Sequence, residues 1–331
     1  MEKLPRLRFA HLPTPVEEMP RLSAALGGPR LLIKRDDLTG LAMGGNKTRK
    51  LEYLLAQAQA DGARRLITAG AIQSNHCRQT AAAAARFGFE CTLVLYPTSS
   101  QEDPTVNEQI PSGNLLLDQL LGAEIVWTQK ARRDQTLKAT FENSWERGQK
   151  PYLIPYGGSS PTGAAAYVFA LNELIAQQHI PDWIVFPSSS GGTHAGLALG
   201  AYMYKFSGKI FGISVDEEQD TLQKRVASLA SETANLLRES YRFSPEDILV
   251  EADYLGGGYG VMGENEREAI RLFAINEGLL LDPVYTARAA GGMINLIRNG
   301  KFKKGQTVLF WHTGGTPALF AEKYRQLGEK S

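Results

Sequence analysis

Short apolar runs alternate with longer amphipathic segments along most of this chain. Runs of four to six apolar residues are typical of buried strands, whereas apolar residues at i, i+3, i+4 and i+7 are typical of helices. The pattern predicts strands at residues 31–35, 65–69, 91–96, 124–127, 152–154, 183–186, 210–215 and 307–310. It predicts helices at residues 51–58, 75–86, 115–121, 131–147, 163–178, 194–205, 219–239, 264–276, 286–298 and 316–327.

Regular alternation of strands and helices predicts an α/β protein with open, twisted, mostly parallel sheets and helices on both faces. No fixed-period repeat interrupts this alternation. No linker marks a domain boundary either, and the polar turn at 157–163 is the best place for the chain to cross between two lobes.

Composition narrows the class of protein. The chain has 331 residues, with 36 Lys plus Arg against 35 Asp plus Glu, so its net charge of +1 argues against a nucleic-acid or membrane-surface partner. Its apolar runs are shorter than the ~20 residues of a membrane span, and we expect a cytoplasmic protein. Cys77 and Cys91 form no CxxC pair and the five histidines lack metal-site spacing, so no metal is expected.

The stretch from Gly44 to Lys50 places a lysine where a glycine-containing loop enters a helix. The glycines allow a sharp turn and leave room for a flat ring beside Lys47. A partly desolvated amine at such a place can lose its proton and attack a carbonyl, as a Schiff-base lysine does. The alternative interpretation is a solvated basic first turn, which is common on protein surfaces.

Two further loops follow expected strands, and ligands of open α/β sheets bind beyond such strand ends. The loop at 70–76 supplies hydroxyl and amide groups at a helix start, which suit a carboxylate, although a plain capping turn fits it as well. The loop at 188–196 exposes backbone N–H groups and hydroxyls at a helix start. It lacks the GK[ST] of a nucleotide loop, so a single phosphate group is its best ligand.

Tyrosines and hydroxyls on later loops complete the candidate chemistry. Tyr259 and Tyr285 could pass a proton or orient a carboxylate, although buried tyrosines are more often structural. Thr313 lies in a turn after the last expected strand. A Schiff-base lysine, a cradle for one phosphate and hydroxyls at strand ends together indicate pyridoxal 5′-phosphate.

Five motifs, in order along the chain, resemble one enzyme family. They are Gly44-Gly45-Asn46-Lys47-x-Arg49-Lys50-Leu51-Glu52, Gln73-Ser74-Asn75-His76, Ser190-Gly191-Gly192-Thr193-His194-Ala195-Gly196, Leu281-Asp282-Pro283-Val284-Tyr285-Thr286 and His312-Thr313-Gly314-Gly315. The chain is similar over about residues 5–320 to the D-cysteine desulfhydrase and 1-aminocyclopropane-1-carboxylate deaminase family. That family belongs to the fold-type II pyridoxal-phosphate enzymes, whose fold is like that of the tryptophan synthase β-subunit.

The resemblance implies a role for each matching residue. Lys47 would form the Schiff base and move protons at the α-carbon, with Ser74, Tyr259 and Tyr285 as the other catalytic residues. The cofactor would be held by Lys47, by Asn75 at its phenolic oxygen, by Thr313 at its ring nitrogen, and at its phosphate by Ser190, Gly191, Gly192, Thr193, His194, Ala195 and Gly196. The substrate would contact Gln73, Ser74, Asn75, His76, Tyr259, Tyr285 and Thr286.

The same resemblance implies a division of the chain into two lobes and an assembly. A large cofactor-binding domain would comprise residues 1–46 and 159–331, and a small inserted domain would comprise residues 47–158. The family also implies a homodimer that acts on a small amino acid.

The expected reaction is an α,β-elimination that converts D-cysteine to pyruvate, hydrogen sulfide and ammonia. Thr286 agrees with the desulfhydrases, because the deaminases typically carry Glu after the matching tyrosine. Ala287-Arg288 departs from the usual Gly-Lys and puts the exact substrate in doubt. The alternatives are 1-aminocyclopropane-1-carboxylate deaminase, which would yield 2-oxobutanoate and ammonia, cysteate sulfo-lyase, and a regulator that binds the cofactor or an amino acid without turnover.

Overall fold

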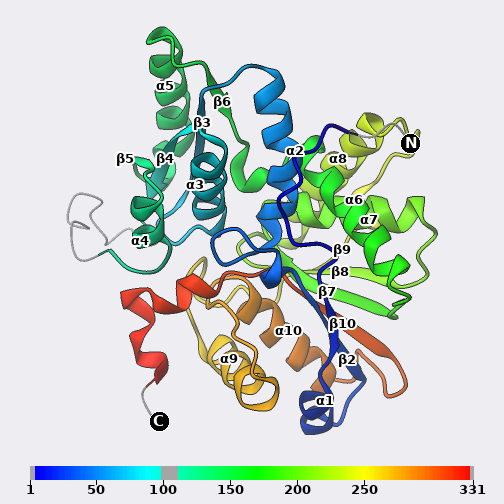
Figure 1. The fold of residues 1–331 in the computed structure, drawn as a ribbon. Coiled ribbons are helices and arrows are strands. Elements are labelled where there is room, and N and C mark those ends of the chain that lie inside the picture. Colours follow the sequence, from blue (N-terminus) through cyan, green and yellow to red (C-terminus); the bar gives the residue numbers. More distant parts are fainter. Residues whose placement is uncertain (1–3, 98–110, 329–331) are drawn as a thin grey trace.

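The computed structural model describes residues 4–97 and 111–328, and its strands form two separate sheets (Figure 1). In the larger sheet β1 runs antiparallel to β2, and the other neighbouring strands are parallel. Its strands in spatial order are β1 (Val16–Glu18), β2 (Arg30–Arg35), β10 (Thr307–His312), β7 (Trp183–Ser188), β8 (Lys209–Ser214) and β9 (Leu249–Glu251).

The smaller sheet is parallel throughout. Its strands in spatial order are β5 (Glu124–Trp127), β4 (Glu90–Tyr96), β3 (Arg65–Ala71) and β6 (Pro151–Leu153). The helices that accompany the two sheets are α1 (Pro20–Leu26), α2 (Asn46–Ala60), α3 (Asn75–Phe87), α4 (Gly113–Leu120), α5 (Arg133–Glu146), α6 (Pro161–Ala176), α7 (Gly192–Met203), α8 (Gln219–Leu236), α9 (Glu264–Glu277) and α10 (Thr286–Arg298). The predicted fold class is therefore confirmed.

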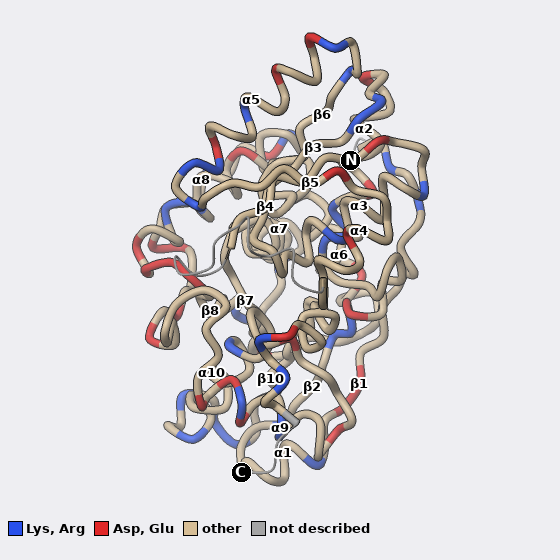
Figure 2. Tube along the Cα trace, turned by 90° about the vertical axis from the view of Figure 1, so that its left-hand side faces the viewer, with Lys and Arg blue, Asp and Glu red and all other residues tan. Residues whose placement is uncertain are grey.

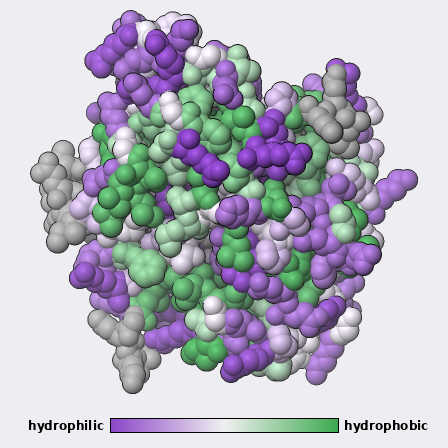
Figure 3. Space-filling model, viewed as in Figure 1, coloured by the Kyte–Doolittle hydropathy of each residue, from purple (hydrophilic) through white to green (hydrophobic). Residues whose placement is uncertain are grey.

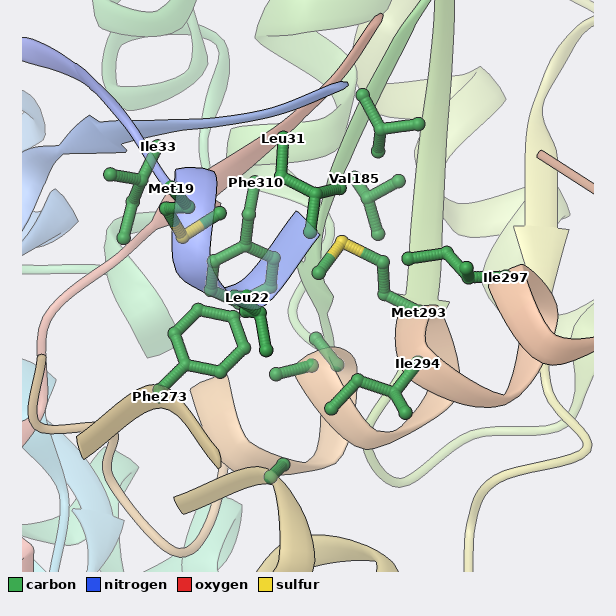
Figure 4. Packing of buried hydrophobic residues seen from close by; sticks show 14 of the residues in the cluster. Met19, Leu22, Leu31, Ile33, Val185, Phe273, Met293, Ile294, Ile297 and Phe310 are labelled. Atoms are coloured by element: carbon green, nitrogen blue, oxygen red, sulfur yellow. The ribbon is translucent and has the colours of Figure 1, made fainter. Parts of the chain in front are cut away.

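Both faces of the larger sheet are buried, because successive side chains of a strand point to opposite faces. Val308 and Phe310 pack with Phe273 of α9 and Met293 of α10 in one core cluster, which Figure 4 shows from close by. The residues between and beyond them, Leu309 and Trp311, belong to a second cluster on the other face with Tyr167 of α6. This two-sided burial explains why the strands appear in the sequence as continuous apolar runs.

The sequence pattern missed three short elements and misassigned one. The strands β1 and β9 have three residues each, and α1 begins at Pro20, within the first 30 residues, for which the pattern predicted no element. The helix expected at 316–327 is instead two 3₁₀ segments, Thr316–Phe320 and Glu322–Gly328. Ala321 between them has extended backbone, which ends the first segment.

The surface shows the balance of charge expected from the composition. Basic and acidic residues are interspersed along the trace in Figure 2, and hydrophilic and hydrophobic areas alternate on the face drawn in Figure 3. Within residues 4–97 and 111–328, none of the helices combines the length and apolar character required to cross a bilayer.

The core cluster around Phe310 should dominate stability. We expect Phe310→Ala to lower the free energy of unfolding by about 3–5 kcal/mol, because it leaves a cavity beside Phe273 in a fully buried site. Phe320→Ala is the control: this ring is 67% exposed, and its loss should cost less than about 0.5 kcal/mol. Urea titration of both variants measures the difference, and equal losses would contradict the assignment of the core.

Candidate active site

A cavity lies where the carboxyl ends of strands from both sheets meet. This is the edge of an α/β sheet at which ligands bind. The residues that line the cavity are Asn46, Lys47, Ser74, Asn75, His76, Tyr156, Gly157, Pro187, Ser188, Ser189, Ser190, Gly191, Thr193, His194, Tyr285 and Thr313. Segments that are far apart in the sequence thus converge as the strand-end loops predicted.

The loop before Lys47 requires its glycines. All residues from Gly40 to Gly45 have positive φ, which L side chains rarely adopt. A Cβ on Gly44 would lie 1.9 Å from the carbonyl oxygen of Asp37, and one on Gly45 would lie 2.2 Å from the side-chain nitrogen of Gln79. The turn is closed by the Gly45 N–H, which donates to the Asp36 carbonyl at 2.9 Å, and it delivers Lys47 to the first turn of α2.

The Lys47 amine lies inside the protein, 3.0 Å from the carbonyl oxygen of Gly157. Burial lowers its pKa from 10.5 to about 8, against a smaller upward effect of the hydrogen bond with Lys50. The Lys50 amine donates to the same carbonyl at 3.2 Å, and burial, with the charge of Lys47, lowers its pKa well below the usual value. A lysine that is readily neutral at the rim of a cavity is suited to attack an aldehyde.

Arg49, in the same turn, is fully paired. Its guanidinium donates to both oxygens of Asp36, at 2.9 and 2.8 Å, and to both oxygens of Glu173 on α6, at 2.9 Å each. Asp36 is completely buried and also accepts the Tyr167 hydroxyl at 2.6 Å. This network attaches the start of α2 to the end of β2 and to α6.

The loop from β7 to α7 has the features of a phosphate cradle. Gly191 is the N-cap of α7 with a φ of 87°, and as a glycine it has no side chain to occupy the helix start. A Cβ on Gly192 would lie 2.6 Å from the Ser159 hydroxyl and 2.7 Å from the Lys50 amine. The Gly192 N–H donates to the Ser159 hydroxyl at 3.1 Å, and that hydroxyl donates to Ser190 at 2.8 Å. Backbone amides, two hydroxyls and a buried amine therefore surround one small volume.

The later residues of the predicted cradle differ in position. Thr193 and His194 line the cavity, and the Thr193 hydroxyl accepts from the Asn46 amide at 3.0 Å. Burial lowers the pKa of His194 to about 3, so its ring is neutral. Ala195 and Gly196 are not among the described lining residues: a Cβ on Gly196 would lie 2.1 Å from the Ala164 carbonyl, so its role is the close packing of α7 on α6.

The Asn75 side chain is oriented by its neighbours. Its oxygen accepts from Arg78 and from Asn114, at 3.0 Å each, so the amide nitrogen is the group left to donate. Thr313 also lines the cavity, and its carbonyl accepts the N–H of Asn46 at 2.9 Å.

The predicted carboxylate loop lies at the N-terminus of α3. Ser74 caps this helix by accepting the Cys77 N–H at 3.2 Å, and Ser74 and His76 line the cavity. Gln73 is turned towards α4: its amide donates to the Ser112 carbonyl at 3.0 Å and accepts the Asn114 N–H at 2.8 Å. Gln73 does not line the cavity, so any role in substrate binding would pass through its neighbours.

The two tyrosines are brought together although 26 residues separate them. Their hydroxyls hydrogen-bond to each other, and Tyr285 lines the cavity while Tyr259 lies behind it. Burial raises the pKa of both phenols well above 10, so both are protonated at neutral pH. Thr286 is outside the lining, because its hydroxyl donates to Asp282 at 2.8 Å.

Sequence comparison assigns the family. The model of the family described as "Pyridoxal-phosphate dependent enzyme" matches residues 7–314. The chain belongs to the pyridoxal-phosphate dependent enzymes. It is 43% identical over 332 residues to a curated D-cysteine desulfhydrase of Salmonella choleraesuis (strain SC-B67), and the match covers 97% of each chain. A D-cysteine desulfhydrase of Salmonella typhimurium (strain LT2) matches equally, at 43% over 331 residues.

Solved structures share the architecture of this chain. The crystal structure of an ACC deaminase homologue superposes with a TM-score of 0.88 at 36% identity, covering 98% of this chain and 97% of that one. A threonine deaminase of Solanum lycopersicum superposes with a TM-score of 0.63 at 17% identity, covering 91% and 79% of the two chains, and this likeness concerns the fold alone.

The residues of the cavity fit pyridoxal phosphate. The group has an aldehyde, a phenolic oxygen, a ring nitrogen and a phosphate, each of which needs a partner. The cavity offers a depressed-pKa amine, an oriented amide, a threonine and a glycine-capped helix start with hydroxyls. The buried Lys50 amine beside Gly192 donates to the neutral Gly157 carbonyl and Ser159 hydroxyl, and a phosphate there would supply an opposite charge.

Three residues of the site were not singled out from the sequence. Lys50 was regarded as part of a basic turn, although its spacing of three from Lys47 puts both on one helix face. Ser159 lies in the turn at 157–163, which was noted only as a crossing between lobes, and Tyr156 directly precedes that turn. The available signal was a tyrosine and a serine on either side of Gly157-Gly158.

The low pKa of Lys47 predicts a stability effect in the cofactor-free protein. Below pH 8 the amine is charged in the folded and unfolded states, so folding bears the full cost of burying that charge. As the pH rises from 8 to 10.5 the folded state has released its proton while the unfolded state still holds one, and the cost declines. Lys47→Met should therefore stabilise the protein by about 3 kcal/mol at neutral pH and by progressively less above pH 8.

Chemical denaturation of the cofactor-free variant at a series of pH values measures this. Lys303→Met, at an exposed lysine, is the control and should change stability by less than about 0.5 kcal/mol at every pH. A Lys47→Met variant that is less stable than the native chain at neutral pH would refute the assignment of a buried, uncompensated amine.

Proposed function

We propose that this protein is a D-cysteine desulfhydrase, which converts D-cysteine and water to pyruvate, hydrogen sulfide and ammonia. The identity of 43% to curated D-cysteine desulfhydrases over 97% of both chains carries the proposal. The depressed-pKa lysine at the strand-end cavity supports it, because elimination needs a base beside the α-carbon.

Pyridoxal phosphate, when bound, supplies an aldehyde that condenses with amines and a conjugated ring that stabilises negative charge at the α-carbon. Asn75 would hold its phenolic oxygen, Thr313 its ring nitrogen and the loop from Ser190 to Gly196 its phosphate. The hydroxyl of Thr313 does not force a proton onto the ring nitrogen as a carboxylate would. Lys50 and Ser159 would add to the phosphate contacts, since both surround Gly192.

We assign Lys47 the role of accepting the α-proton of the substrate. Its amine is neutral in part at pH 7 to 8, because burial lowers its pKa to about 8. The Gly157 carbonyl, at 3.0 Å, orients the amine and cannot neutralise its charge. The amine can thus accept a proton at one stage and return it at another.

The substrate carboxylate is assigned to the N-terminus of α3. The backbone N–H groups of Asn75 and His76, in the first turn of α3, and the Ser74 hydroxyl would face an anion favourably there. Gln73 would support this loop through Ser112 and Asn114, and Thr286 would support Tyr285 through Asp282.

We assign the two phenols the role of hydrogen-bond donors to the departing thiolate. One proton lies between the hydroxyls of Tyr259 and Tyr285, so the pair has a second proton to donate outward. Burial raises the pKa of both groups well above 10, so both stay protonated at neutral pH and can donate hydrogen bonds to the charge of a departing thiolate.

A second function is supported by the likeness to the ACC deaminase homologue, with its TM-score of 0.88. The cyclopropane acid would yield 2-oxobutanoate and ammonia. Thr286 argues against it, because a glutamate typically follows the matching tyrosine in deaminases. Cysteate sulfo-lyase, and a binding protein without turnover, are the remaining alternatives.

We also propose the division into a large domain of residues 1–46 and 159–331 and a small one of residues 47–158. The strands of the four-stranded sheet all fall between residues 65 and 153, which supports this boundary. The homodimer rests on family resemblance. A cytoplasmic location is supported by Cys77 and Cys91, which are both free and buried.

Purified protein loaded with pyridoxal phosphate should release pyruvate and sulfide from D-cysteine in equal amounts. Lys47→Ala should reduce the rate by roughly a hundred- to ten-thousandfold, because it removes the base, and it should abolish the visible absorbance of the lysine-bound cofactor. Lys303→Ala serves as the exposed control and should match the native rate.

A panel of D-cysteine, L-cysteine, D-serine, cysteate and the cyclopropane acid separates the alternatives. Release of 2-oxobutanoate, with no pyruvate from D-cysteine, would establish the deaminase instead. A yellow, loaded protein that turns over none of the five would favour the binding protein.

A further inference from the structure

Arg288 is fully buried one turn into α10, three residues after Tyr285. It stands where the resembling family usually has lysine. Its Nε donates to the Glu266 carboxylate at 2.6 Å, and its two other nitrogens donate to the carbonyls of Val215 at 2.8 Å, Gly258 at 2.9 Å and Val261 at 2.7 Å. One side chain thus joins α10, α9, the end of β8 and the loop that carries Tyr259.

Glu266 completes the arrangement from α9. It is 3% exposed, and its second oxygen accepts the Gly263 N–H at 2.8 Å, which caps α9. The ion pair therefore binds the loop at three points, Gly258, Val261 and Gly263. We call Arg288, Glu266 and these three backbone groups the loop clamp.

The loop would have little rigidity without the clamp. Gly256, Gly258 and Gly260 all have positive φ, and glycine gives the unclamped backbone many alternative conformations. The described contacts on the other side of Tyr259 include the Tyr324 hydroxyl, which donates to the Gly260 carbonyl at 2.8 Å. Two of the three carbonyls that Arg288 binds, those of Gly258 and Val261, lie on either side of Tyr259 in the chain.

We propose that Arg288 is a positioning residue that holds Tyr259 in hydrogen-bonding contact with Tyr285. A guanidinium has five N–H donors in a planar fork, and here it reaches four acceptors in different directions. A lysine has three donors on one atom and cannot span the same set. The proposal rests on the proposed function in one respect, which is that Tyr259 acts on the substrate.

The first test compares Arg288→Lys with Arg298→Lys in the cofactor-loaded enzyme. The control is closely matched, because Arg298 lies on the same helix and pairs with Glu268 of the same α9 at 2.7 Å, but on the surface. Hydrogen exchange of the 254–263 segment should accelerate by at least about tenfold in Arg288→Lys and stay native in Arg298→Lys. This readout requires no turnover, so it holds whichever substrate the enzyme uses.

The second test asks whether the clamp acts through Tyr259. Arg288→Lys should lower kcat by roughly ten- to a hundredfold and change KM much less, with the visible cofactor absorbance unchanged. Arg288→Lys in a Tyr259→Phe background should cause no further loss of kcat, because the phenol that it positions is already absent. The comparison of the single and double variants uses whichever amino acid of the panel the native enzyme converts.

Native exchange of the 254–263 segment in Arg288→Lys overturns the proposal, and so do additive losses in the double variant. Glu266→Gln weakens the same clamp from α9 and decides the matter if Arg288→Lys fails to fold. A native enzyme that converts none of the panel refutes the proposed function, while the exchange result still decides whether the clamp holds the loop.

Discussion

The site depends first on the buried ion pair between Asp36 and Arg49. Burial alone would raise the pKa of Asp36, but the charge and hydrogen bonds of Arg49 prevail and hold it below its usual value. Two cations, Lys34 and Arg49, face two anions, Asp36 and Glu173, within one contact network. Buried charges are tolerated only when paired and hydrogen-bonded in this way, and the pairing joins β2, α2 and α6 rigidly beneath the cavity.

The first turn of α2 has one face with a structural role and one face suited to chemistry. Residues 47 and 50 lie on one face of α2 because they are three apart, and residue 49 points away from them. On one side Arg49 pairs with two carboxylates, whereas on the other side Lys47 and Lys50 donate to the neutral Gly157 carbonyl, and Lys50 also to the Ser159 hydroxyl. The pKa of Arg49 is therefore raised, whereas those of Lys47 and Lys50 are lowered, because the fold brings different partners to the two faces of α2.

The fold and the first residues of the site could be predicted because they are local. Apolar runs such as 183–186 and the glycine turns before Lys47 carry their meaning in neighbouring residues. The partners of Lys50 and Arg288 could not be predicted in this way. Ser159 lies 109 positions from Lys50, and Val215 lies 73 positions from Arg288, so only the packed structure brings them together. The helix predicted at 316–327 was wrong because its apolar spacing resembles that of a helix, whereas the backbone at Ala321 is extended.

The distribution of charge explains why such a site should bind an anionic cofactor. Among the described residues that line the cavity there is no carboxylate, Lys47 lines it, and the buried Lys50 amine donates to the same Gly157 carbonyl as Lys47. Holding these amines against neutral partners works against folding, and the strained loop of residues 40–45 adds to that cost. A phosphate at the start of α7 would offset the charge of Lys50. A bond between the Lys47 nitrogen and an aldehyde carbon would remove the free ammonium group from the site. The features that make the site unfavourable by itself are thus the ones that a phosphorylated aldehyde would stabilise.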